Sequence, residues 1–263
     1  MSAENKKIRL PFWETVRRSY MYVIANFGAL CKLAAPAFAI VIYEMCSGFP
    51  TIDITNGGNY DEESLSNIVA VVLYLLVSLA LSVACCRQII LKKQGEYITW
   101  EFWRRTFFYI LCNLLILLII AVCVFVTFCV ASVVFAMFGA ANHRIYVFMA
   151  FAFIVFVILG SRFFIALPAA AVGNKEAGIM AAFRMAKGNA NRIFWGHALM
   201  VIPGIVLMYA WQFIYAIIGS GNFVSSTIVM VIYFAVSFLD TIFRASYFAH
   251  AYQYFIYYQK KDK

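Results

Sequence analysis

Six long apolar runs dominate the sequence and constrain what it can fold into. They lie near residues 27–47, 66–86, 114–138, 145–171, 194–219 and 225–249. Each is close to or above the roughly 20 residues that an α-helix needs to cross the hydrocarbon of a bilayer. Because 65% of the 263 residues are hydrophobic and 13% are charged, a water-soluble globule could not bury this surface. We therefore predict an all-α, polytopic membrane protein with six transmembrane helices, since barrel strands would alternate in polarity.

The charges between the runs predict how the chain is oriented. Residues 47–65 carry acidic side chains but no Lys or Arg. Basic residues gather instead in the N-terminal segment, in 87–105, in 174–192 and in the C-terminal tail. Because basic residues stay on the cytoplasmic side of a membrane, we expect both termini to be cytoplasmic.

A mixed aromatic and basic sequence occurs twice, each time directly before an apolar run. The stretch from Phe12, "FWETVRRSYMYVIANF", shares Trp, Glu, two Arg, Tyr and Asn with the stretch from Thr99, "TWEFWRRTFFYILCNL". Such a short amphipathic helix is expected to lie in the headgroup plane, and we call it an elbow helix. We expect the chain to bend near Asn26 and near Asn113 and then to descend through the bilayer.

A third, weaker copy begins at Asn174, "NKEAGIMAAFRMAKGNANRIFW". Asn174 is a plausible helix N-cap, and Ile179, Phe183 and Ala186 follow at helical spacing. The residues "KGNAN" then supply a bend. The alternative is that aromatic and basic residues recur at any cytoplasmic boundary without forming a repeat.

These copies predict a single transmembrane domain, residues 1–263, built from three pseudo-repeats of an elbow helix and a transmembrane hairpin. The repeats cover about 11–98, 99–173 and 174–255, and a short basic tail follows at 256–263. The expected interfacial anchors are aromatic or basic residues of the three elbows: Trp13, Arg17, Arg18, Trp100, Trp103, Arg104, Arg105, Arg184 and Lys187.

A few charges fall inside or at the edge of the spans, where charged side chains are costly and usually face protein or an aqueous cavity. They include the candidate anion- or lipid-binding residues, namely Lys32, Arg87, Arg162, Asp240 and Arg244. Three convergent guanidinium groups would suit a phosphate or a phospholipid headgroup. The alternative is that Arg162 and Arg244 extend to the inner headgroups while Asp240 neutralises Arg244, its neighbour at i+4.

Other functional classes find little support in the sequence. The three histidines are scattered and show no metal-ligand spacing, and no nucleophile or phosphate-binding motif is present. The net charge of +9 is spread through an apolar chain instead of forming a nucleic-acid-binding domain. We expect a non-enzymatic protein with no cofactor, no metal and no nucleic-acid partner. Pro36, Pro168 and Pro203 are expected to kink their helices.

The segment "SRFFIALPAAAVGNKEAGIMAAFRMAKGNANRIFW" resembles a known family across nearly the whole chain. It is similar to the six-helix membrane domain that precedes the catalytic domain in some bacterial glycerophosphodiester phosphodiesterases. The matching features are an Arg late in the fourth span, "ALPAAAV", a Gly, and an amphipathic Arg/Lys helix ending in "GN". These 263 residues contain no counterpart of the catalytic domain, so we do not expect hydrolase activity. The resemblance implies a bacterial inner-membrane location and a role as scaffold, anchor or lipid-interacting module.

From these observations we predict a membrane scaffold or lipid-interacting module whose partners are anionic membrane lipids and, in addition, an unidentified protein. The alternative function is a transporter of small solutes or lipids. A continuous water-accessible path lined by the intramembrane charges would favour transport, whereas a filled core with those charges paired would favour a scaffold.

Overall fold

The computed structural model describes residues 9–32, 34–35, 39, 63–92, 99–138, 159–174, 178–218 and 223–261. Within these ranges the chain is helical and forms no strand, which confirms the predicted all-α class. Among the described residues, three helices are long and apolar enough to cross a membrane, over Val72–Leu91, Trp100–Val130 and Ala190–Ala210. They support the prediction of a membrane protein, whereas the count of six spans and the three repeats are not confirmed.

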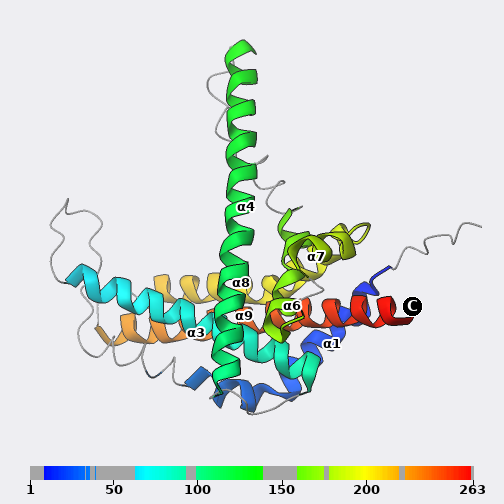
Figure 1. Cartoon of the computed structure of the whole chain (residues 1–263). Coiled ribbons are helices and arrows are strands. Elements are labelled where there is room, and N and C mark those ends of the chain that lie inside the picture. The colour runs from blue at the N-terminus through cyan, green and yellow to red at the C-terminus, as the bar shows by residue number, and fades with distance from the viewer. Residues whose placement is uncertain are drawn as a thin grey trace, which may run out of the picture.

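The longest helices run in two different directions (Figure 1). Helices α3 (Glu63–Leu91), α8 (Ala190–Ile218) and α9 (Phe223–Lys261) run alongside one another, and α9 packs against both of the others. Helix α4 (Trp100–Phe138) stands steeply across them and contacts α3 and the short helix α6 (Ala166–Val172). An array of six spans near one bilayer normal would instead place α4 alongside α3. The observed crossing differs from that expectation.

Helix α9 lies close to its neighbours because small residues line both contacts. On α8, Gly196 faces the ring of Tyr247, and a Cβ at Gly204 would lie 3.3 Å from the Cβ of Asp240. On α3, the thiols of Cys85 and Cys86 point at backbone carbonyl oxygens of α9. Small residues let apolar helices approach until their backbones almost touch. These two contacts fix the position of α9.

The helix breaks at Asn26, where a bend was predicted, whereas the bend predicted at Asn113 is wrong. Helix α1 (Phe12–Ala25) ends at Asn26, and a helical segment resumes at Phe27. Helix α4, by contrast, passes through Asn113 without a break and is 39 residues long. It contains neither Gly nor Pro, and one Asn in a helix interior costs only about 0.7 kcal/mol or less. Nothing in this stretch therefore forces the helix to end.

The third elbow forms in part as predicted. Helix α7 (Ile179–Met185) is followed by a turn over Ala186–Asn189 before α8 begins. Its N-cap is Gly178, not Asn174 as predicted. Asn174 instead ends α6, where its backbone N–H donates to the carbonyl of Ala169 and its side chain donates to the hydroxyl of Tyr252. The helical trace before α6 breaks at Phe164 and Ile165. Pro168 explains this break, because it lacks the N–H that would bond to the carbonyl of Phe164.

The first elbow packs its apolar side against protein. Val16 is buried, and Phe12 and Tyr20 are partly buried, where α1 contacts α8 and α9. The hydroxyl of Tyr20 donates to the carbonyl of Leu199 at 2.7 Å. The first and third elbows also meet, because the side-chain oxygen of the buried Asn189 accepts from the N–H of Leu10 at 2.8 Å. The elbow helix is therefore part of the folded core.

We predict that Gly173→Ala and Gly196→Ala each destabilise the protein by about 1–3 kcal/mol. Gly173 has φ +74°, and a Cβ there would overlap the guanidinium of Arg105. A Cβ at Gly196 would overlap the phenol of Tyr247. Thermal unfolding of the detergent-solubilised protein measures both effects. The control is Gly28→Ala, where a Cβ meets nothing within 4 Å. An equal loss in all three variants would contradict the close contacts.

Candidate functional site

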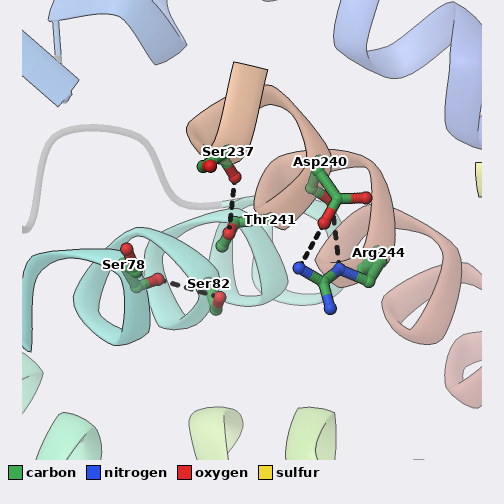
Figure 2. Close-up of polar contacts among 6 residues, drawn as sticks. All are labelled: Ser78, Ser82, Ser237, Asp240, Thr241 and Arg244. Atoms are coloured by element: carbon green, nitrogen blue, oxygen red, sulfur yellow. Dashed lines mark hydrogen bonds and ion pairs between the residues drawn. The ribbon is translucent and has the colours of Figure 1, made fainter. Parts of the chain in front are cut away.

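The structure brings two of the predicted intramembrane charges together. Asp240 and Arg244 lie one turn apart on α9, and Nη2 of Arg244 forms an ion pair with Oδ2 of Asp240 (Figure 2). The Nε of Arg244 lies 3.5 Å from the backbone carbonyl oxygen of Asp240. The third guanidinium nitrogen points away from Asp240 in the same view. The pair is therefore charge-balanced, and the third nitrogen of the guanidinium makes no contact with Asp240.

A cavity of about 360 Å³ lies beside this guanidinium. It is partly open, and its lining comes from α3, α4, α6, α8 and α9, together with Phe164 just before α6. Its polar lining comes from seven side chains, Ser78, Ser82, Tyr109, Asn113, His197, Thr241 and Arg244. Its apolar lining includes Leu75, Leu79, Leu114, Leu117, Leu167 and Phe248. A mostly apolar cavity thus carries several polar groups in its lining.

The polar groups of the cavity differ in how far they are satisfied. Ser82 donates to the carbonyl of Ser78 at 3.0 Å, and Thr241 donates to the carbonyl of Ser237 at 2.9 Å (Figure 2). By contrast, Oγ of Ser78 and Nε2 of His197 are buried and have no hydrogen-bond partner among the described residues. The His197 ring packs against Phe248, with the ring centres 5.0 Å apart. Two unsatisfied polar atoms therefore belong to residues that line one cavity.

The other predicted charges occupy different surroundings. Arg87 is buried on α3, and the guanidinium of Arg162 stacks 5.1 Å from the centre of the Phe183 ring on α7. Lys32 is exposed. Of the three arginines expected to converge, Arg244 is the one that lines the cavity. The structure thus joins Asp240 to Arg244 and does not gather the three guanidinium groups around this cavity.

Most of the predicted interfacial anchors are exposed. Trp13 and Trp100 expose 73% and 81% of their surface. The other exposed anchors are Arg17, Arg18, Trp103, Arg104, Arg184 and Lys187. Arg105 differs, because 82% of its side chain is covered and its guanidinium lies against Gly173 at the end of α6. A cation at a helix C-terminus offsets the partial negative charge of the last carbonyl groups. Arg105 therefore joins α4 to α6.

Sequence reasoning missed six cavity residues, namely Ser78, Ser82, Tyr109, Asn113, His197 and Thr241. A signal was available, because Ser78 and Ser82 are four residues apart inside a predicted span, and Tyr109 and Asn113 are four residues apart in the second elbow sequence. Side chains at this spacing share one face of a helix. What could not be read from the sequence is that faces of different helices meet at one cavity.

Searches of protein-family models, of curated proteins and of solved structures find no match to this chain. Within the described residues, no group of three or more His, Cys, Asp and Glu side chains could hold a metal ion. The function therefore has to be argued from the geometry of the chain itself.

We predict that Arg244→Ala destabilises the protein more than Asp240→Ala does. Without Arg244, a carboxylate that is 16% exposed, with a buried Oδ1 lacking a hydrogen bond, loses its counter-charge. Without Asp240, the 43% exposed guanidinium can still reach polar surroundings. The expected excess loss is about 1–3 kcal/mol, the cost of leaving a buried polar group unsatisfied.

Thermal unfolding of the two variants in the same detergent checks this order. The double variant Asp240→Ala/Arg244→Ala is expected to recover part of the loss, because it removes both charges. Equal losses in the two single variants would contradict the account of the pair.

Proposed function

We propose that this chain is a non-enzymatic inner-membrane protein that acts as a scaffold and binds anionic lipid headgroups with its elbow helices. The observation that carries the proposal is the exposed face of α1. Trp13, Arg17, Met21 and Ile24 are exposed along this face. A face that combines a Trp and aliphatic side chains with an Arg suits the headgroup region of an anionic bilayer.

Helix α4 supports the same arrangement at the second elbow. Its buried residues, Phe102, Thr106, Tyr109, Ile116 and Ile120, follow one narrow stripe at spacings of three, four and seven residues. Around that stripe, large apolar side chains such as Leu118 and Phe125 are more than 60% exposed. Such a surface is expected to contact hydrocarbon. Trp100, Trp103 and Arg104 stand exposed at its N-terminal end, where the interface would lie.

In this proposal α4 crosses the hydrocarbon, the elbows lie at the cytoplasmic headgroups, and both termini are in the cytoplasm. The first elbow is held in place through α8 and α9, and the second is continuous with α4. The chemistry of the exposed surface favours membrane lipid as the partner. The elbows would therefore hold the cytoplasmic ends of the helices at headgroup depth.

We predict that Arg17→Gln combined with Arg104→Gln lowers the amount of phosphatidylglycerol that stays bound to the purified protein by at least about twofold. Each Arg near an anionic surface contributes about 1 kcal/mol. Within the part of the chain that the structure describes, neither of these two forms an ion pair, unlike Arg18 with Glu14. Mass spectrometry of retained lipid measures the effect.

The matched control is Lys92→Gln, which removes an exposed charge at the end of α3. It is expected to retain phosphatidylglycerol almost as the unchanged protein does. Equal retention in the elbow variant and the unchanged protein would refute anionic-lipid binding by the elbows.

Transport is the second candidate function, and the cavity beside the Asp240–Arg244 pair is the observation that favours it. Solute sites in transporters lie near the membrane midplane and are lined by polar groups. Solute transport would be ruled out if proteoliposomes released a broad set of small entrapped solutes no faster than liposomes without the protein. Release that is lost in Leu114→Trp, which adds bulk at the cavity lining, would favour it over the scaffold.

A further inference from the structure

The cavity beside Arg244 has the features of a binding site, and a scaffold function alone does not require such a site. It is set among helices that carry the candidate membrane spans: Ser78, Asn113 and His197 fall within the three apolar stretches of α3, α4 and α8. Its volume of about 360 Å³ falls within the range of about 300–1,000 Å³ that is typical of small-molecule sites. It can hold a polar head and the first part of a tail.

The mouth of the cavity is apolar. Leu75 on α3 and Leu114 and Leu117 on α4 line the cavity, and within the described structure each also exposes more than 40% of its surface. A ligand that passes these side chains comes from the hydrocarbon side of the helices. The geometry therefore favours a lipid-like molecule over a solute that arrives from water.

The residues that line the cavity include unsatisfied hydrogen-bonding atoms. Oγ of Ser78 and Nε2 of His197 are buried without a partner in the described chain, and the third guanidinium nitrogen of Arg244 points away from its carboxylate. Unsatisfied buried polar atoms are costly in apolar surroundings. A ligand with carbonyl or hydroxyl oxygens would satisfy them.

The charge of the site argues against an anionic headgroup. Asp240 already balances Arg244, and Arg87 and Arg162 are not among the residues that line the cavity. An anion would have to compete with Asp240 for the guanidinium and would leave one negative charge without a partner. Burying an unpaired charge costs several kcal/mol, whereas a neutral head leaves the ion pair intact.

We propose that this cavity binds a neutral amphiphile, with a head that bears carbonyl or hydroxyl oxygens and an apolar tail that leaves between Leu75 and Leu114. Oxygen atoms of the head accept hydrogen bonds from Arg244 and Ser78. The head forms one further hydrogen bond with Nε2 of His197. An isoprenoid quinone and a diacylglycerol both have this chemistry. The site is separate from the elbows, so this proposal can be tested independently of anionic-lipid binding by the elbows.

The test measures binding of decylubiquinone, dioctanoylglycerol and phosphatidylglycerol to the full-length protein in detergent, by ligand-induced thermal stabilisation and by calorimetry. We expect one or both of the neutral probes to bind. Binding of decylubiquinone alone would assign a planar quinone head, binding of dioctanoylglycerol alone would assign a glyceride head, and binding of both would show that head shape is not selected.

Three variants test the position of the site. Leu114→Trp fills the mouth and is expected to abolish binding of the neutral probe, whereas Leu118→Trp, on the same helix and 61% exposed but outside the cavity lining, is expected to preserve it. Ser78→Ala removes one hydrogen bond and is expected to weaken binding about fivefold. Its thermal stability without ligand should not fall, because no hydrogen bond of that hydroxyl is lost.

Three results would overturn the proposal. They are failure of both neutral probes to bind, neutral-probe binding that survives Leu114→Trp, and phosphatidylglycerol binding that Leu114→Trp removes while Arg17→Gln/Arg104→Gln leaves it intact. The last result would place the anionic lipid in the cavity. Loss of phosphatidylglycerol in the elbow variant alone would support the elbow function and leave neutral-probe binding to decide the cavity.

Discussion

The close approach of α9 to α8 and α3 is the contact on which the rest of the structure depends. Because Gly196 and Gly204 have no side chain, α8 can lie close to Tyr247 and Asp240 of α9. In lipid, such packing is a main force that can hold helices together, because hydrocarbon tails solvate apolar side chains as well as other helices do. The contact sets the position of the Asp240–Arg244 pair and so one wall of the cavity. It also forms part of the surface against which α1 packs.

Helix α4 differs from α9, because most of its apolar surface is not packed against other helices. It buries one narrow stripe of side chains and leaves most of its apolar surface exposed. Its backbone needs no partner, because a continuous helix satisfies its own hydrogen bonds. A chain of this composition can therefore combine a tightly packed group of helices with a helix that relies on lipid to cover it. The cavity lies at the place where these two parts meet.

The sequence was sufficient to predict several local features of the fold. Apolar run length predicts the long helices, and the i, i+4 spacing of Asp240 and Arg244 predicts their ion pair. The bend at Asn26 and the turn after α7 follow from local residues as well. The failure at Asn113 has a physical cause, since the repeated sequence suggests a bend but α4 lacks the Gly or Pro that would break it.

The site itself was less accessible to sequence reasoning. Arg105 was expected at the membrane interface, yet its contact with Gly173 depends on how α4 meets α6. Arg87, Arg162 and Arg244 occupy similar places in the proposed repeats but have different neighbours in space. The unsatisfied atoms of Ser78 and His197 become visible only when the helices are packed. Tertiary contacts of this kind are set by pairs of helix faces, which spacing along one helix cannot define.

The central claim is that α1 lies at headgroup depth while α4 runs through hydrocarbon. A nitroxide attached through a genetically encoded ketone residue, at Ile24 in one sample and at Phe125 in another, tests it in reconstituted bilayers. The account predicts that the label at Ile24 is reached by a water-soluble relaxation agent near the headgroups, whereas the label at Phe125 is reached mainly by oxygen dissolved in the bilayer core. A label at Phe125 that is open to water, or one at Ile24 buried at the bilayer centre, would contradict the account.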